Sequence, residues 1–304
     1  MDFTFFDVSE DDADRRLDKV LKCILESHNA KDKNVFSLVR KNLVKLNGKK
    51  TKAEVHVKSG DRLEVASFLL GEKKEIEKLK KNADVPELNI VFENEHLLII
   101  NKPAGLNVQP SKENGECLSS YVESYYASKN VKKSLSFTPG PLHRIDRFTR
   151  GLVCFSMSLK GARWFSENLA EHKIKKTYRG VMEGHFGEIG RKEHFEDLID
   201  DLNEYHQTDG FHTVKAGTEK GKYASTFVTP VEYKIIKGTE VTVAEFEIET
   251  GRKHQIRAQS ALHGHPLYAD KAYGSSYSGN FDLCAFRLEF PENNLGIPAV
   301  VLLD

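Results

Sequence analysis

Residues 143–155 read HRIDRFTRGLVCF and join a charged loop to an apolar run that is typical of a buried strand. One carboxylate, Asp146, lies among Arg144, Arg147 and Arg150. Nearby cations favour the ionised form of a carboxylate, so we expect them to lower the pKa of Asp146. An ionised carboxylate on a loop that enters a buried strand could act as a nucleophile or a base. The alternative is a structural ion pair at the strand start, and the spacing alone weighs the two evenly.

The composition predicts a soluble globular protein of one large domain or two ordinary ones. The chain has 304 residues, of which 39% are hydrophobic and 30% are charged. No apolar run is long enough to span a bilayer and the first residues lack the basic segment of a signal peptide, so we expect a cytoplasmic protein. Four scattered cysteines without a CxxC pair indicate reduced thiols: Cys23, Cys117, Cys154 and Cys284.

The formal net charge of zero hides an uneven distribution of charge. Residues 1–14 hold six acidic side chains and no basic one, whereas residues 15–65 hold 14 Lys and Arg against 6 Asp and Glu. Residues 191–209 are acidic again. A basic segment of this kind suggests a surface for nucleic acid, although an ordinary solvated lysine-rich face would look the same.

The chain divides into a small module, a charged linker and a larger second domain, over residues 1–66, 67–87 and 88–304. Short periodic segments in the module predict an α/β fold, with helices over 17–25 and 36–42, an Asn-Gly turn at 47–48 and a strand over 62–65. The second domain has many strands and few helices, which predicts an α+β fold with a largely antiparallel mixed sheet. We expect its strands over 88–92, 97–100, 152–158, 177–183, 223–235, 241–249, 282–290 and 298–303, and its helices over 117–128, 160–172 and 253–263.

The strand that begins near Lys176 carries a cation and an aromatic ring on one face. Lys176 and Tyr178 are two residues apart, and alternate residues of a strand share a face. Such a pair could stack on a base and hold its phosphate. The commoner alternative is a lysine at the strand edge beside a half-buried tyrosine.

Residues 250–257 read TGRKHQIR and place cations at the start of a helix. The free N–H groups of a helix N-terminus suit phosphate, and Arg252 and Lys253 add positive charge there. Arg257 lies three residues after His254, so the two share one side of the helix. From there Arg257 could pair with Asp146 and orient it, or it could simply lie in solvent.

The histidines at the end of this helix suggest a metal site only weakly. His263 and His265 are two residues apart in a Gly- and Pro-containing loop, with Asp270 nearby and no second cluster at ligand spacing. A turn that docks the helix end explains them better, so we expect no metal. The chain also lacks the motifs of phosphate loops, dinucleotide folds and serine hydrolases.

Together these segments resemble the RluA-type pseudouridine synthases. The resemblance covers roughly residues 88–290 and follows the family order of motifs: KPAGL at 102–106, HRIDR at 143–147, KTY at 176–178, GRKHQIR at 251–257, GHPL at 264–267 leading to Asp270, and Tyr273-Gly274. Residues 15–65 are similar to the S-four (αL) RNA-binding module, through RLD at 16–18, LNGK at 46–49 and Gly60-Asp61.

The resemblance implies an enzyme that isomerises uridine to pseudouridine in RNA, without cofactor or metal, after flipping the uridine out of its stack. It implies that Asp146 attacks the ribose C1′, that Tyr178 packs on the target base and assists loss of the C5 proton, and that Arg257 pairs with Asp146 and holds it ionised. Arg144 and Arg147 would contact the phosphates of the flipped nucleotide or the gap it leaves. The other expected RNA-binding residues are Lys176, Arg252, Lys253 and His254.

The sequence leaves several readings of the substrate open. We expect a monomer that acts on 23S-type large-subunit ribosomal RNA. The alternatives are a transfer-RNA pseudouridine synthase, a non-catalytic RNA-binding or ribosome-assembly factor on the same fold, and a metal-dependent nuclease that uses His263, His265 and Asp270. Residues 148–151 read FTRG where the family usually has Asp-Thr-Ser-Gly, so the loop beside Asp146 departs from the pattern.

Overall fold

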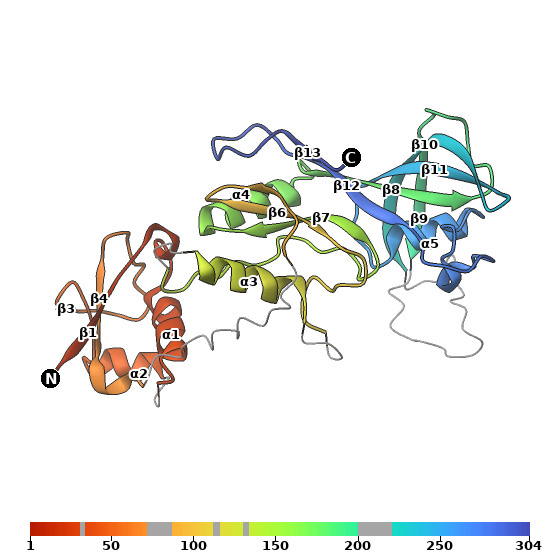
Figure 1. Ribbon diagram of the computed structural model, residues 1–304. Coiled ribbons are helices and arrows are strands. Elements are labelled where there is room, and N and C mark those ends of the chain that lie inside the picture. The colour runs from red at the N-terminus through yellow and green to blue at the C-terminus, as the bar shows by residue number, and fades with distance from the viewer. Residues whose placement is uncertain (31–33, 72–86, 112–115, 130–133, 200–220) are drawn as a thin grey trace. The chain divides into compact units, whose positions relative to one another are not determined.

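The computed structural model describes the chain except for residues 31–33, 72–86, 112–115, 130–133 and 200–220 (Figure 1). The described residues form two compact units. The first unit comprises Met1–Glu87, Ser120–Gly140 and Ser156–Arg163. The second comprises Leu88–Ser119, Pro141–Phe155 and Trp164–Asp304. Most of the expected linker, 67–87, falls on residues outside those described.

The N-terminal part of the first unit contains, among its described residues, a four-stranded antiparallel sheet and two α-helices. The helices are α1 (Leu17–Ser27) and α2 (Val35–Arg40), and the strand order is β1 (Phe3–Asp7), β4 (Arg62–Ala66), β2 (Val44–Leu46), β3 (Lys49–Lys50). The periodic apolar side chains of α1 are buried in the core of this unit, as the sequence predicts. Asn47 and Gly48 have φ of 51° and 75° and form the expected tight turn between β2 and β3.

The acidic N-terminal segment is partly structural. Asp12 is fully buried, and its carboxylate accepts hydrogen bonds from the Ser134 and Ser136 hydroxyls, both at 2.6 Å, and from the amides of Leu135 and Ser136. Burial alone would raise the pKa of Asp12, but these hydrogen bonds outweigh it and hold the pKa below its usual value. This carboxylate therefore joins residues 9–12 to residues 134–136 within the first unit.

The described residues of the second unit form one nine-stranded sheet, and its mixed, largely antiparallel pairing confirms the predicted α+β class. The strand order is β5 (Ile90–Glu93), β6 (Leu97–Lys102), β7 (Arg150–Ser156), β12 (Leu283–Glu289), β8 (Lys175–Glu183), β11 (Thr239–Ile248), β10 (Lys222–Ile236), β9 (Glu193–Ile199), and β13 (Val300–Leu302) pairs with β12. The pair of β7 with β12 is parallel, and the pairs β5–β6, β12–β8, β8–β11, β11–β10 and β10–β9 are antiparallel. The second unit also contains α5 (Gln255–Leu262) and most of α4 (Leu159–Ala170), whereas α3 (Leu118–Ser128) belongs mostly to the first unit.

Two features of this sheet fix the position of the charged loop before β7. The core beneath it is made of apolar side chains from β6, β7 and β12, among them Leu97, Leu152 and Leu288. Gly151 has φ of +113°, and a Cβ there would lie 2.3 Å from the carbonyl oxygen of Ala285. Only glycine permits β7 and β12 to approach this closely.

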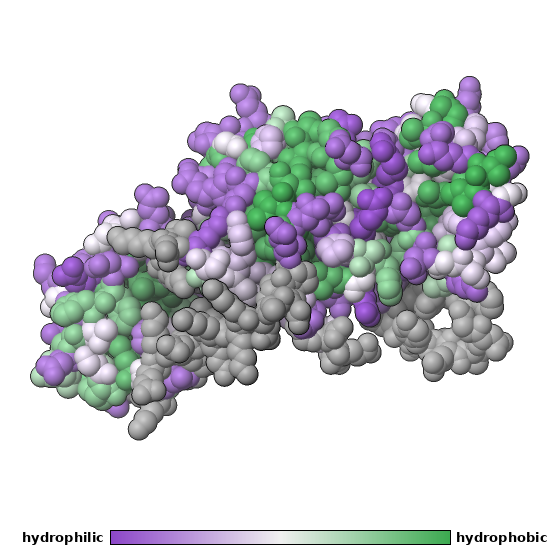
Figure 2. Space-filling model, viewed as in Figure 1, coloured by the Kyte–Doolittle hydropathy of each residue, from purple (hydrophilic) through white to green (hydrophobic). Residues whose placement is uncertain are grey.

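The sequence did not predict strands β1 and β9. The segment of β9 is rich in charge, EHFEDLI, and it forms a strand because it pairs with β10 over seven positions. Helix α5 packs beside it, with Ile199, Ala224 and Ala258 in one buried cluster. Figure 2 shows apolar residues at the surface over the ends of β10 and β11, where Ile235 is 74% exposed. None of the described helices is long and apolar enough to cross a membrane.

Candidate active site

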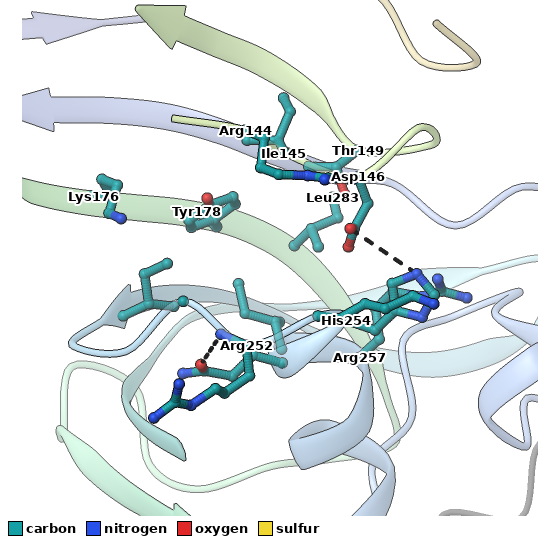
Figure 3. Close-up of a pocket in the computed structure, with 15 residues that line it drawn as sticks. Arg144, Ile145, Asp146, Thr149, Lys176, Tyr178, Arg252, His254, Arg257 and Leu283 are labelled. Carbon is teal, nitrogen blue, oxygen red and sulfur yellow. Dashed lines mark hydrogen bonds and ion pairs between the residues drawn. The ribbon is translucent and has the colours of Figure 1, made fainter. Parts of the chain in front are cut away.

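A pocket in the second unit brings together the segments that the sequence analysis singled out (Figure 3). The loop before β7 contributes Asp146 and Arg144, and β8 contributes Lys176 and Tyr178. The turn after β11 and the first turn of α5 contribute the whole segment 251–257. Segments more than 100 residues apart in the sequence therefore share one pocket.

Asp146 lies at the start of a tight turn, and its side chain points into the pocket (Figure 3). The amide of Thr149 donates to the Asp146 carbonyl at 3.1 Å, which closes the turn. Burial raises the pKa of the Asp146 carboxyl, and the charges of Arg257 and Arg144 offset this only in part. The expectation of a lowered pKa was wrong, because burial outweighs the nearby cations. Arg150, one of the three arginines expected to act on Asp146, instead donates to Asp282 at 2.8 Å.

Among the described residues, the imidazole of His254 lies within ion-pair distance of Asp146. Its Nε2 lies 4.0 Å from Oδ1 of Asp146, the contact drawn as a dashed line in Figure 3. Its Nδ1 lies 2.8 Å from the hydroxyl of Tyr273. His254 has φ of 54°, a left-handed conformation that is uncommon for histidine, and it precedes the first residue of α5. The local backbone therefore aims the imidazole at Asp146.

Arg257 does not form the expected hydrogen-bonded pair with Asp146. Its Nε and Nη2 donate to the two carboxylate oxygens of Asp270 at 2.6 and 2.7 Å, and both side chains are almost fully buried. The rings of Tyr273 and Phe281 lie 4.6 and 4.5 Å from the guanidinium. Asp270 can accept both hydrogen bonds from the Arg257 guanidinium because residues 264–270 fold back against the end of α5. The Arg257 charge is still the largest of those that lower the pKa of Asp146.

Lys176 and Tyr178 both line the pocket, as strand alternation predicts. Burial raises the pKa of the Tyr178 hydroxyl, and the charge of Asp146 raises it further. Tyr178 is therefore a neutral phenol at physiological pH. Burial lowers the pKa of the Lys176 ammonium, with a partial offset from Cys154.

The remaining predicted cations are divided between the pocket and its surroundings. Arg144, Arg252 and Lys253 line the pocket, and Arg252 donates to the carbonyl of Tyr223 at 2.8 Å. Arg147 does not line the pocket, and its Nε donates to the Gly105 carbonyl at 2.9 Å. The pocket thus holds one carboxylate facing several cations and an aromatic ring.

The three residues considered above as a weak candidate metal site, His263, His265 and Asp270, have other partners. Asp270 binds Arg257, His263 lies 3.2 Å from Asp197 and stacks on Phe195, and Nδ1 of His265 bonds the Glu183 carbonyl. Among the described residues there is no group of three side chains that could hold a metal ion. These contacts attach the turn after α5 to the neighbouring strands, as expected for a turn that docks the end of the helix.

Residues 96–262, more than half of the chain, match the family model described as RNA pseudouridylate synthase. The chain belongs to the RNA pseudouridylate synthase family. The activity expected from the resemblance, isomerisation of uridine to pseudouridine in RNA, is thereby confirmed.

Several relatives of this family are similar over much of the chain. Ribosomal large subunit pseudouridine synthase C of Vibrio parahaemolyticus is 28% identical over 92% of this chain and 84% of its own length. The tRNA pseudouridine synthase C of Haemophilus ducreyi is 28% identical over 62% of this chain and 74% of its own. The solved structure of human RNA pseudouridylate synthase domain containing 1 shares the fold, with a TM-score of 0.54, 22% identity and coverage of 68% of this chain and 80% of its own.

Lys102 is a family-motif residue to which the sequence analysis assigned no role. Its ammonium is fully buried and donates to the carbonyls of Pro103, Leu106 and Arg147 at 2.8–3.0 Å. Burial lowers the pKa of Lys102 to about 8, despite the opposing effect of Asp146. The signal in the sequence was a lysine that ends an apolar strand, since such a lysine must find buried acceptors.

His143 ties the loop of Asp146 to β7. Its Nε2 accepts a hydrogen bond from the Cys154 amide at 3.1 Å, and its ring stacks on Phe165. Burial lowers the pKa of His143 to about 3, so the imidazole is neutral at physiological pH. A proton on Nε2 would remove this acceptor and place two N–H groups against each other, one from His143 and one from Cys154.

We expect acid to weaken the fold through His143. The unfolded chain binds a proton at this histidine below about pH 6.5, whereas the folded chain does so only near pH 3. The stability that a neutral His143 provides is thus complete above about pH 6.5 and is lost as the pH falls, at up to about 1.4 kcal/mol per pH unit. Urea unfolding of the protein and of His143→Gln at pH 6 to 4 measures the two slopes. The variant should lose stability less steeply, and equal slopes would contradict a buried neutral His143.

Proposed function

We propose that this chain isomerises specific uridines to pseudouridine in 23S-type large-subunit ribosomal RNA, with Asp146 as the nucleophile. The observation that carries the mechanism is that Asp146 lines one pocket together with Tyr178 and several cations. The choice of ribosomal RNA rests on the relatives. Those named ribosomal large subunit pseudouridine synthase C align with about nine tenths of the chain, and those named for tRNA align with 62% and 69% of it. A cytoplasmic location and a monomeric state stay predictions.

In this mechanism the Asp146 carboxylate attacks C1′ of the target ribose and displaces uracil through the C1′–N1 bond. The detached uracil rotates and its C5 forms the new bond to C1′, which releases the carboxylate. The proton on C5 is lost and N1 regains one, so atoms and charge balance within the nucleotide. The reaction consumes no external reagent.

Tyr178 supports this reaction as a neutral phenol. Because its pKa is raised, a phenolate base is disfavoured, and the ring is suited to pack on the flipped uracil. Its hydroxyl can then relay the C5 proton. We propose that Arg257 acts through its charge, which favours ionised Asp146, while Asp270 holds the guanidinium in place.

The cations around the pocket are proposed to hold the RNA. A flipped nucleotide brings its phosphates close to the pocket mouth, and lysine and arginine neutralise phosphate. The proposed contacts are those from Arg144, Lys176, Arg252, Lys253 and His254, which line the pocket, and from Arg147 beside it.

Tritium release tests this function directly. Purified protein is mixed with transcripts of large-subunit ribosomal RNA, and separately with transfer RNA, both labelled with tritium at uracil C5. We expect release from the ribosomal transcript, because the C5 proton is lost when the new bond forms. Release from transfer RNA alone would move the proposal to the second substrate class, and release from neither would overturn it.

The N-terminal module, residues 1–66, is proposed to bind RNA through its basic side chains. Lys49, Lys50 and Lys52 are exposed on and just after β3. Replacing all three with Ser should weaken RNA binding and lower the slope of log affinity against log salt by roughly 2 to 3, if each lysine neutralises one phosphate. The matched control replaces three exposed lysines of the second unit, Lys173, Lys234 and Lys237. Equal salt slopes for the two triple variants would argue against RNA binding by the module.

A further inference from the structure

Phe148 lies two residues after Asp146, and 51% of its surface is exposed. Single exposed apolar side chains are common on proteins and need no explanation of their own. Phe148 differs because two residues of chain span at most about 7 Å, which keeps its backbone next to that of the nucleophile. The adjacent Thr149 is only 1% exposed, so the turn itself is packed while the phenyl ring projects from it.

The loop that carries Phe148 is held rigidly by the segment 102–106. The carbonyl of Arg147 accepts hydrogen bonds from the Gly105 amide at 2.8 Å and from Nζ of Lys102 at 3.0 Å. In return, Nε of Arg147 donates to the Gly105 carbonyl at 2.9 Å. Gly105 has φ of +90°, which favours glycine at this position. The exposed ring is therefore attached to a preorganised frame, which lowers the entropic cost of binding a ligand there.

The guanidinium of Arg147 lies over the ring of Phe148, 5.3 Å from its centroid. This contact fixes a cation beside an exposed aromatic surface. Aromatic rings next to cations are the combination on which nucleic-acid bases stack while their phosphates are neutralised. Neither Arg147 nor Phe148 lines the pocket of Asp146, so the pair is suited to a nucleotide other than the target.

We propose that Phe148 and Arg147 form a stacking platform for a base that neighbours the flipped uridine. The proposal rests on the proposed function, since a uridine that leaves the stack exposes the face of the base beside it. The phenyl ring covers that face and Arg147 pairs with the adjoining phosphate. Phe148 would then favour target sites whose neighbouring base stacks well.

Fluorescence tests this contact without relying on activity. The chain has one tryptophan, Trp164, so Phe148→Trp in a Trp164→Phe background carries one indole, at the platform. Adding the large-subunit ribosomal RNA transcript should quench this indole, because stacking on a base quenches its emission. The control is Ile235→Trp in the same background, at a 74% exposed position of β10 that does not line the pocket. Equal quenching at both positions, or none at either, would overturn the platform.

Activity separates this proposal from the proposed function. Phe148→Leu keeps an apolar side chain and loses the ring, so kcat/KM for tritium release should fall about ten-fold, while Phe148→Tyr should retain most of it. Ile235→Ala is the matched control and should behave as the unaltered protein. Full activity of Phe148→Leu would overturn the platform and leave the function intact. No release by the unaltered protein would instead overturn the function, and the quenching experiment would still decide whether RNA stacks at Phe148.

Discussion

Replacing Asp146 with Asn should abolish pseudouridine formation, with a loss of at least about 10³-fold in kcat, as is found when other enzymes lose their nucleophile. Asn has nearly the same shape as Asp but cannot attack C1′. The pocket retains its cations and Tyr178, so the affinity for RNA should change by no more than about two-fold. Single-turnover tritium release and filter binding measure the two quantities on the same preparation.

The control for this substitution is Asp282→Asn. Asp282 also lies near the loop, where it accepts from Arg150, but its side chain is 58% exposed and is not part of the pocket. Its variant should retain activity. Release by Asp146→Asn at a rate near that of the control would exclude a nucleophilic role for Asp146.

The second large effect is expected at the buried pair of Arg257 and Asp270. Asp270→Leu leaves the Arg257 guanidinium buried without its carboxylate, which should lower the free energy of unfolding by about 3–5 kcal/mol. Isomerisation should also be lost, because Arg257 is no longer held where its charge favours ionised Asp146. Urea unfolding followed by circular dichroism measures the first effect. Tritium release at a temperature where the variant is folded measures the second.

Two comparisons make this prediction specific. Asp282→Leu breaks an exposed arginine–aspartate pair and should cost no more than about 1 kcal/mol. The double variant Arg257→Met with Asp270→Leu removes the unpaired charge, so it should recover much of the stability and none of the activity. A double variant that recovered activity would show that Arg257 has no part in the reaction.

Much of the fold was open to prediction because local pattern and tertiary structure agree. Helix α1 buries the apolar side chains that recur at helical spacing, and Asn47-Gly48 forms the hairpin turn its residue types favour. At the site, the alternation along β8 placed Lys176 and Tyr178 in one pocket. In each case a short stretch of sequence contains the physical cause.

The predictions that were wrong or missing concern features whose physical cause is a residue or strand far away in the sequence. Strand β9 exists because it pairs with β10, and its own composition argues against a strand. The partner of Arg257 was missed because Asp270 arrives on a separate loop. The predicted direction of the pKa shift of Asp146 was wrong, because the sequence shows the number of nearby cations but not how deeply the carboxyl is buried.

The most direct test of the central claim is a map of pseudouridine in ribosomal RNA from cells that lack this protein. We predict that at least one uridine of the large-subunit RNA is unmodified in these cells. Expression of the unaltered chain should restore pseudouridine there, and expression of Asp146→Asn to the same level should not. An unchanged map without the protein, or restoration by Asp146→Asn, would contradict the account.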